Sequence, residues 1–230
     1  MSIVEHLDEL RTRLIWVLIC LGVGTTLGWW QRVPLRHFLQ TPLGAFPLVY
    51  LKPTEAFVVN LKLAFALGVL LTLPVILYHT LAYCLPGAGT RLRRKIWTAT
   101  ALGSILFFTG AGFGVKAVLP SVIQFLLSFA DASLVPQISV DYYLTFVFGM
   151  ALVFGLSFEL PLLMWMLGSL GLVSATFLRQ NRRYAILFNC IAAAILTPPD
   201  VLSQMLLFIP LLILYELGIW LVVLTEKQKM

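Results

Sequence analysis

The sequence predicts an all-α integral membrane protein that crosses the bilayer six times and keeps both ends on the cytoplasmic side. The chain of 230 residues is 60% hydrophobic and only 11% charged, whereas an average soluble domain carries about 25% charged residues. Its mean hydropathy is +0.95. The apolar residues stand in long blocks, and lysine and arginine are divided unequally between alternate gaps. Together these features predict spans, topology and orientation.

A spanning helix needs about 20 mostly apolar residues, and six blocks approach or exceed that length. We expect a single membrane domain over residues 1–230 with spans at 14–30, 56–78, 96–118, 143–168, 184–197 and 205–224. The fifth block has 14 residues, so its helix is shorter than a hydrocarbon core of about 30 Å. We interpret it as a short span in a locally thinned bilayer. The alternative is a buried or re-entrant helix.

Orientation follows from the basic residues. One set of gaps, with the two chain ends, carries 11 lysines and arginines, whereas the other set carries only Arg32, Arg36 and Lys52. Segments rich in these residues stay cytoplasmic, so both termini are expected inside. Lys62 and Lys116 lie near the outer ends of spans, where we expect their ammonium groups to snorkel outward.

Two proline effects are predicted. Residues 34–40, which begin with Pro34, are expected to form a short amphipathic helix on the outer interface. Pro161, in the fourth span, removes the backbone donor for the carbonyl of Ser157 and is expected to kink that helix. No internal repeat is evident, so an inverted-repeat transporter is not supported.

No catalytic constellation is evident. The three histidines are far apart in the sequence, and neither an HExxH nor a GxSxG motif is present. The three cysteines show no zinc-type spacing. We therefore expect no enzymatic activity, no metal and no cofactor. The net charge of +6 is explained by the basic gaps rather than by a nucleic-acid partner.

The N-terminal segment contains a candidate binding residue. Glu5, Asp8 and Glu9 place negative charge at a helix N-terminus, which the helix dipole favours. Glu9 is also spaced to pair with Arg13 at i, i+4. The functional alternative is that Glu9 offers a cytoplasmic carboxylate to a basic ligand, because an arginine guanidinium matches a carboxylate bidentately. Spacing alone leaves both interpretations open.

Polar residues inside the spans are also candidates. A carboxyl group at membrane depth usually faces protein or a water-filled cavity. Glu159, beside the expected kink, either faces a concave surface or is a neutral packing residue, and for Glu216 the packing role is favoured. Thr197 and Gln204 flank the loop between the last two spans. They either cap helix ends or bond a partner helix.

Six short motifs follow one another along nearly the whole chain. They are His6-Leu7-x-Glu9-Leu10-Arg11-x-Arg13, Pro53-x-Glu55-x-Phe57, Pro74-Val75-Ile76-Leu77-Tyr78, Phe154-Gly155-x-x-Phe158-Glu159-x-Pro161, Thr197-Pro198-Pro199-Asp200-x-x-Ser203-Gln204 and Ile209-Pro210-x-x-x-x-Tyr215-Glu216. In this order they resemble the TatC family, the multispanning core of the twin-arginine protein translocase. The resemblance implies a concave, glove-like arrangement with short fifth and sixth helices. It also implies a multi-pass location in a bacterial or archaeal cytoplasmic membrane.

The resemblance further implies a function. Such a subunit binds paired-arginine signal peptides and exports folded proteins with the proton-motive force, alongside single-span TatA- and TatB-type partners, and we expect it to self-associate in a larger complex. The implied signal-peptide-binding residues are Glu9, Asp8, Arg11 and Tyr83. The implied intramembrane polar site is Glu159, and the implied docking residues for partner helices are Thr197 and Gln204.

The chain also departs from the family pattern. Leu92 stands where the family usually has a second glutamate for the arginine pair, and Leu81 and Tyr83 stand for a tryptophan and a phenylalanine. Asp8 or Glu5 are candidates to compensate for the missing carboxylate. Two other functions remain in view. One is a proton-coupled small-solute transporter that uses an intramembrane glutamate. The other is a membrane anchor for a respiratory enzyme, although the absence of intramembrane histidine pairs argues against haem.

Overall fold

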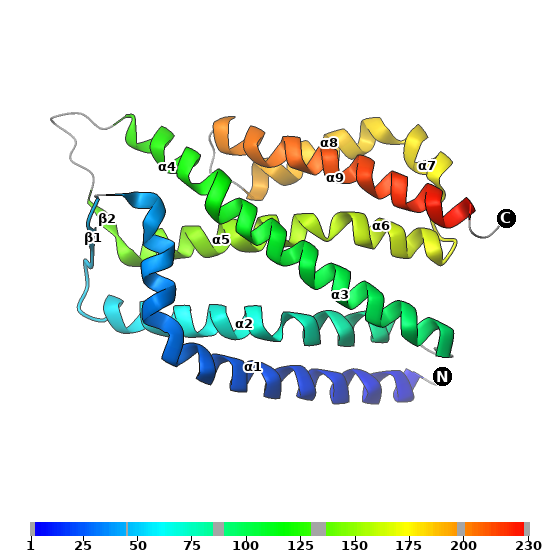
Figure 1. The fold of residues 1–230 in the computed structure, drawn as a ribbon, viewed down its shortest axis with the longest axis horizontal. Helices are drawn as coiled ribbons and strands as arrows, with labels where there is room; N and C mark the ends of the chain where they lie inside the picture. The colour runs from blue at the N-terminus through cyan, green and yellow to red at the C-terminus, as the bar shows by residue number, and fades with distance from the viewer. Residues whose placement is uncertain (1–2, 45, 85–89, 130–136, 197–200, 228–230) are drawn as a thin grey trace. The chain divides into compact units, whose positions relative to one another are not determined.

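The computed structural model describes residues 3–44, 46–84, 90–129, 137–196 and 201–227, and helices dominate it (Figure 1). In chain order the main elements are α1 (Ile3–Gln40), β1 (Leu48–Val49), α2 (Glu55–Cys84), α3 (Thr90–Phe113), α4 (Leu119–Leu127), β2 (Ile138–Ser139), α5 (Val140–Phe158), α6 (Leu160–Ser169), α7 (Ala175–Gln180), α8 (Arg182–Leu196) and α9 (Val201–Lys227). A 3-10 turn, Thr41–Leu43, follows α1, and a π-helical segment, Gly114–Val118, joins α3 to α4. The prediction of an all-α membrane protein is confirmed in its class.

Five helical stretches of the described chain are long and apolar enough to cross a membrane. They are Val4–Leu43, Glu55–Tyr83, Ile96–Leu127, Val140–Ser169 and Val201–Glu226. Each overlaps one of the expected spans. The remaining expected span, 184–197, coincides with α8, which has 15 residues. The expected short length is therefore confirmed for this block. It is wrong for the last helix, because α9 has 27 residues. The count of six spans and the orientation of the termini stay predictions.

The first helix is longer than its apolar block. It runs for 38 residues with Pro34 inside it, and it bends toward its C-terminal end in Figure 1. Residues 34–40 are helical as expected, but they continue α1 past Pro34, so the prediction that they form a separate short helix is wrong. Proline removes one backbone donor without preventing helical dihedral angles. Beside it, the Arg32 guanidinium donates to the carbonyl of Trp29 and lies 4.1 Å from the centre of that ring.

The fourth span is interrupted as expected. The helix α5 ends at Phe158 and α6 begins at Leu160, with Glu159 between them. Helical bonding resumes at once, because the N–H of Leu163 donates to the carbonyl of Glu159 at 2.9 Å. Pro161 explains the break, since it has no N–H to offer to the preceding turn. The interruption lies where the kink was predicted, and it places Glu159 at the joint between α5 and α6.

The chain divides into two compact units. The first is Met1–Ile105 with Gln137–Phe148, and the second is Leu106–Pro136 with Gly149–Met230. Consequently α3 and α5 each contribute one part to each unit. The expectation of a single membrane domain stays a prediction.

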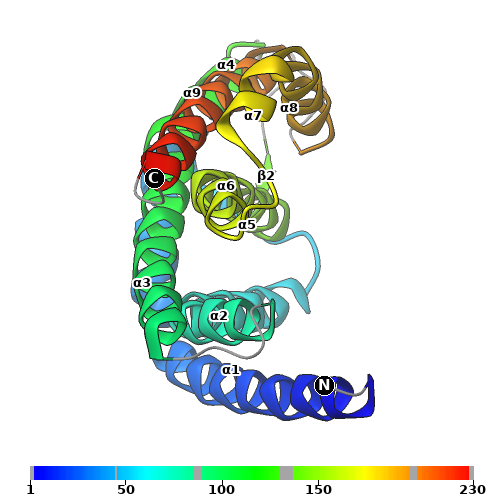
Figure 2. The same ribbon diagram turned by 90° about the vertical axis from the view of Figure 1, so that its right-hand side faces the viewer.

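In the first unit, α1 and α2 lie side by side in both views (Figures 1 and 2). Glycines allow this approach. A Cβ added at Gly28 would lie 2.5 Å from the carbonyl oxygen of Ala64, and one added at Gly68 would lie 2.7 Å from the backbone nitrogen of Thr25. Small residues of this kind let helix backbones approach closely in membranes, where packing replaces the hydrophobic driving force. The close contact between α1 and α2, which we call the α1–α2 seam, therefore requires glycine at these two positions.

In the second unit, glycines receive aromatic and branched side chains. A Cβ at Gly114 would lie 2.9 Å from the Phe154 ring, and Phe154 is fully buried. Between α6 and α9, a Cβ at Gly168 would lie 2.9 Å from Val222. Val222 belongs to a buried cluster with Met164, Ala175 and Ile219. This packing holds α6, α7 and α9 together.

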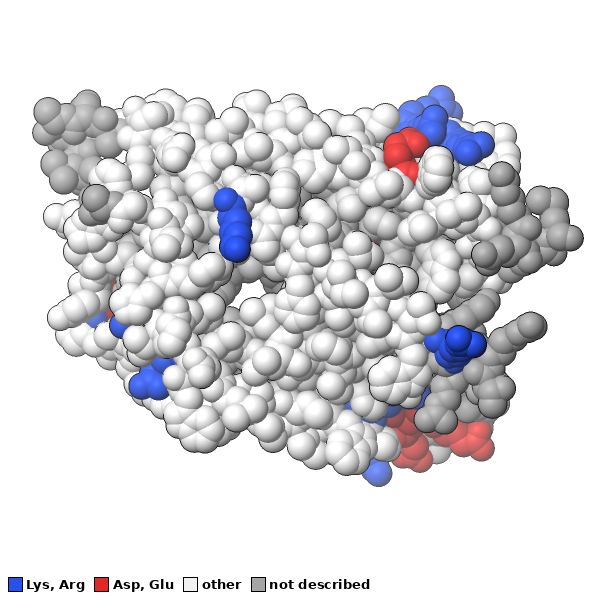
Figure 3. All heavy atoms as spheres, in the orientation of Figure 1, with Lys and Arg blue, Asp and Glu red and all other residues white. Residues whose placement is uncertain are grey.

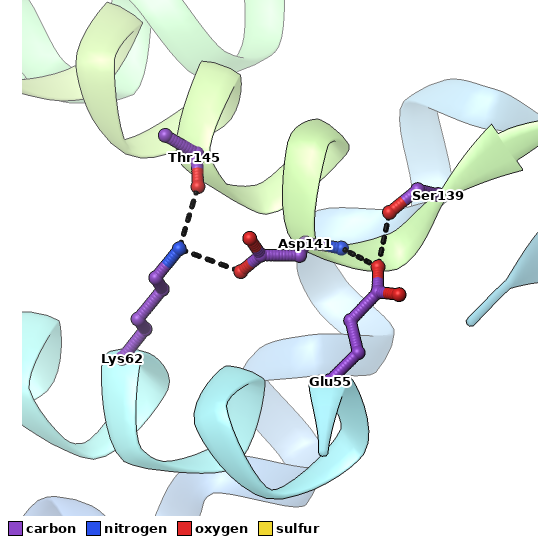
Figure 4. A network of polar contacts seen from close by, with 5 residues as sticks. All are labelled: Glu55, Lys62, Ser139, Asp141 and Thr145. Carbon is purple, nitrogen blue, oxygen red and sulfur yellow. Dashed lines mark hydrogen bonds and ion pairs between the residues drawn. The ribbon is translucent and has the colours of Figure 1, made fainter. Parts of the chain in front are cut away.

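A polar network ties the start of α2 to β2 and α5 in the first unit (Figure 4). We call it the Glu55 network, and its side chains are Glu55, Lys62, Ser139, Asp141 and Thr145. One oxygen of the Glu55 carboxylate accepts from the Ser139 hydroxyl and from the backbone N–H of Asp141 at 3.0 Å. The other accepts from the backbone N–H groups of Leu51 at 2.6 Å and Lys52 at 3.2 Å. Nearby, β1 and β2 pair in parallel.

Candidate functional site

Charged side chains are few and gathered. On the face shown in Figure 3, acidic and basic side chains gather over the N-terminal end of α1 and over the region of α7 and α8, and a few further charged side chains lie elsewhere. The N-terminal part of α1 holds Glu5, Asp8, Glu9, Arg11 and Arg13. The carboxylates of this segment could bind a cationic ligand, so the segment is the first candidate site.

Glu9 is held by an arginine of its own helix. Its Oε1 accepts two hydrogen bonds from Arg13, one from Nε at 2.9 Å and one from Nη2 at 2.5 Å. The side chains are 21% exposed for Arg13 and 24% for Glu9. The spacing of four residues places them on one face of α1, so the predicted i, i+4 pair is confirmed. The carboxylate thus already accommodates one guanidinium, the group that the functional alternative requires.

Tyr83 meets the N-terminal segment from the other helix of the seam. Its ring stacks on His6, with centroids 4.3 Å apart and planes 14° from parallel. Farther along α2, the Tyr78 ring lies 5.0 Å from Trp97 of α3. His79 lies between Tyr78 and Tyr83 in sequence, and its buried Nδ1 has no hydrogen-bond partner among the described residues. The His6–Tyr83 stack was not predicted, because the two residues belong to different helices.

The other residues implied for signal binding are placed less closely. Asp8 and Arg11 are exposed on α1. The backbone carbonyl of Asp8 accepts from the Thr12 hydroxyl at 2.9 Å, a contact that does not involve the Asp8 carboxylate. Leu92 lies in the first turns of α3, and its side chain is outside the described part of the chain. The structure therefore brings Glu9 to Arg13 and Tyr83 to His6, and it leaves Asp8 and Arg11 facing outward.

Glu159 is a buried carboxyl at the α5–α6 joint. The residue is 6% exposed, and its Oε1 has no hydrogen-bond partner among the described residues. A buried polar oxygen without a partner is costly, so this position is unlike an ordinary packing site. The interpretation as a hydrogen-bonded packing glutamate is not supported at this oxygen.

Glu216 is different from the expectation. Its Oε2 lies 2.7 Å from Nη2 of Arg182, and the two side chains are about half exposed, at 51% for Glu216 and 49% for Arg182. The favoured role as a neutral packing residue is therefore wrong. The pair links the first turn of α8 to α9. It was missed because 34 residues separate the partners and no local periodicity connects them.

The docking candidates fall at the meeting of α8 and α9. The Gln204 amide donates to the carbonyl of Cys190 at 3.4 Å, which holds α9 to α8. Next to Cys190, Asn189 is buried, and its Nδ2 has no partner among the described residues. Thr197 lies outside the described residues. Within the part of the chain that the structure describes, no group of three or more His, Cys, Asp or Glu side chains could hold a metal ion.

Comparison with known proteins points to one family. The family model described as "Sec-independent protein translocase protein (TatC)" matches residues 5–210. A TatC protein of Desulforapulum autotrophicum is 38% identical over 220 residues, covering 94% of this chain and 82% of the relative. One from Aquifex aeolicus is 35% identical over 236 residues, covering 100% of this chain and 98% of the relative.

A solved structure agrees along almost the whole chain. The crystal structure described as "Twin Arginine Translocase Receptor- TatC" superposes with a TM-score of 0.82 at 32% sequence identity. The match covers 96% of this chain and 99% of the solved one. Sequence and fold therefore lead to the same relatives.

Proposed function

Because this chain belongs to the TatC family of Sec-independent protein translocase proteins, we propose that it is the signal-peptide-binding subunit of a twin-arginine translocase. It sits in the cytoplasmic membrane of a bacterium or archaeon with both termini inside. There it recognises paired-arginine signal peptides and passes folded cargo outward, driven by the proton-motive force. Single-span TatA- and TatB-type proteins and further copies of this chain complete the complex.

One observation carries the binding role. The Glu9 carboxylate accepts two N–H groups of one guanidinium, at 2.9 and 2.5 Å. Both N–H groups go to the same oxygen, Oε1, and a guanidinium offers two such groups in one plane, which a lysine ammonium does not. Glu9 is also about a quarter exposed, so a ligand can reach it from water. We assign the arginine pair of the signal to Glu9 and the neighbouring exposed Asp8, with Arg11 and Tyr83 lining the same segment.

The apolar part of the signal needs a different surface. We assign it to the face that carries Glu159, at the joint of α5 and α6. The α8–α9 junction, with Thr197 and Gln204, is the proposed docking place for partner helices. The short α8 supports this assignment, because at about 1.5 Å per residue its 15 residues do not reach across a core of about 30 Å. A thinned bilayer beside α8 would lower the barrier to cargo.

The binding role is tested with the full chain in detergent and a labelled peptide carrying paired arginines. Glu9→Gln keeps the shape of the side chain and removes its charge, so we expect about a tenfold loss of affinity. Arg183→Gln is the control, since it changes the charge of the chain at an exposed position of α8. Equal affinity of the wild type and Glu9→Gln would reject Glu9 as the receptor carboxylate.

The second candidate is a proton-coupled small-solute transporter, and the observation that favours it is the buried, unpaired Oε1 of Glu159. Liposomes that contain only this chain separate the two functions. A transporter exchanges solute without partners, whereas a translocase subunit does not. Solute counterflow that Glu159→Gln abolishes would favour the transporter.

A further inference from the structure

The candidate receptor carboxylate is not vacant. Arg13 donates both Nε and Nη2 to the same oxygen of Glu9, Oε1. This is the contact that an arginine of a ligand would make. Because the donor and the acceptor stand four residues apart on α1, the pair forms within the helix and needs no other part of the fold.

We propose that Arg13 is an internal competitor for Glu9, which sets the affinity that a cationic ligand must have in order to bind. This inference rests on the proposed function. A ligand guanidinium gains its full contact with Oε1 only when the Arg13 guanidinium leaves. The measured affinity is therefore the intrinsic affinity of the open carboxylate, reduced by the fraction of time that it stands open.

The strength of the pair suits this role. Exposed ion pairs of this spacing contribute little to helix stability, so a ligand of moderate affinity can displace Arg13 from Glu9. The pair here is about three-quarters buried at both side chains, which reduces screening by salt. An occlusion that reduces ligand affinity by about two- to fivefold follows from these limits.

A ligand with paired arginines should compete with Arg13 more effectively than a ligand with a single cation. The Asp8 carboxylate is exposed beside Glu9 on the same helix, and it gives the second arginine a partner that Arg13 does not hold. Leu92 adds no carboxylate at the position where the family usually has one. Competition by Arg13 therefore matters more in this chain than it would with two receptor glutamates.

Competition and positioning make opposite predictions. If Arg13 competes, its removal strengthens binding, and it does so by the same factor for a paired-arginine and a paired-lysine peptide, because the occluded state contains no ligand. If Arg13 instead orients the Glu9 carboxylate for its ligand, its removal weakens binding and changes the ratio between the two peptides. The two peptides therefore report on the role of Arg13 independently of the absolute affinity.

The experiment measures both peptides by fluorescence anisotropy with the full chain in lipid nanodiscs. We expect Arg13→Gln to bind each peptide about two- to fivefold more tightly, with an unchanged ratio. Arg13→Lys, which keeps a charge at this position, should lie between the wild type and Arg13→Gln. Arg183→Gln removes the same charge from α8 and should leave both affinities unchanged.

A double-mutant cycle separates competition from general electrostatics. In a Glu9→Gln background the occluding pair is absent, so adding Arg13→Gln should have no further effect. A strengthening that persists in that background would overturn the proposal in favour of a general charge effect. Weaker binding by Arg13→Gln would overturn it in favour of positioning, with the receptor role of Glu9 intact. If Glu9→Gln alone binds like the wild type, it is the proposed function that fails.

Discussion

The Nζ of Lys62 lies 2.6 Å from a carboxylate oxygen of Asp141 and joins α2 to the first turn of α5 (Figure 4). The same ammonium donates to the Thr145 hydroxyl at 3.0 Å. The outward snorkelling of Lys62 stays a prediction, and the structure adds two protein partners to an ammonium group whose side chain is 38% exposed. The pair lies beside Glu55, so the Glu55 network contains one buried acceptor and one partly exposed ion pair. The two should differ in their effect on stability.

Lys62→Met should lower stability only slightly. Its side chain is 38% exposed and that of Asp141 is 31% exposed, so solvent screens the pair and its loss costs about 1 kcal/mol at most. For a chain of this size that corresponds to a shift of about 2 to 4 °C in the melting temperature. Thermal unfolding in detergent measures it. Lys52→Met is the matched control, because the Lys52 backbone, not its side chain, takes part in the network.

Glu55→Ala should destabilise the chain more than Lys62→Met does. The residue is 8% exposed, and its removal leaves the Ser139 hydroxyl and the N–H groups of Leu51, Lys52 and Asp141 without their acceptor. The Ser139 hydroxyl is buried, so without its acceptor it keeps the full desolvation penalty. We expect a drop in melting temperature of roughly twice that of Lys62→Met. Equal shifts for the two variants would contradict the importance of the Glu55 acceptor.

The α1–α2 seam should not tolerate a large side chain at Gly68. Gly68→Leu places a side chain where the α1 backbone lies 2.7 Å from the first added carbon, and overpacking of this kind costs about 1 to 3 kcal/mol or more. Gly22→Leu is the control, since a Cβ at Gly22 meets nothing within 4 Å. Both changes raise helix propensity equally. The melting temperature should therefore fall for Gly68→Leu and not for Gly22→Leu. An equal fall for Gly22→Leu would show that overpacking between α1 and α2 is not the cause.

Leu92→Glu should strengthen the binding of a paired-arginine signal peptide. The change supplies a second carboxylate where the resemblance places one, and an added charge-assisted contact near the surface is worth about three- to tenfold in affinity. Peptide anisotropy with the full chain measures the effect. A paired-lysine peptide should gain less, because an ammonium lacks the guanidinium fork. An unchanged affinity would remove Leu92 from the proposed binding surface.

Glu159→Gln should separate signal binding from transport. The residue is buried at the α5–α6 joint, and glutamine keeps its volume, so the fold should be retained. Peptide binding at Glu9 should match that of the wild type, because the change lies outside that segment. Export of a folded reporter from cells should fall if the carboxyl group at this joint takes part in passage of the signal. Normal export would rule out a transport role for the Glu159 carboxyl.

Periodicity and composition predicted the long helices because an apolar block of about 20 residues has few alternatives in a bilayer. Pro161 predicted the break before α6 for an equally local reason. The i, i+4 pair of Glu9 and Arg13 was also readable, since it depends on helical spacing alone. Each of these predictions rests on neighbours in the sequence.

What could not be predicted depends on distant partners. Ser139 and Glu55 are 84 residues apart, and Arg182 and Glu216 are 34 apart, so no local pattern announces either contact. The extent of α1 could not be predicted for a different reason. Pro34 indicates the start of a new helix, but the loss of one backbone donor does not end α1, which continues to Gln40. Contacts between residues that are distant in the chain cannot be identified from a single sequence.

The contrast between near and distant contacts has a consequence for biogenesis. The seam between α1 and α2 joins consecutive helices, so it can close while the rest of the chain is still being synthesised. The parallel pairing of Leu48 with Ile138 and the contacts of Glu55 with Asp141 must wait until the ribosome has passed α5. Assembly of the first unit should therefore begin with the packing of α1 against α2 and end with the formation of the Glu55 network. Variants of the Glu55 network would then stall at a late stage, with the helical hairpin already inserted.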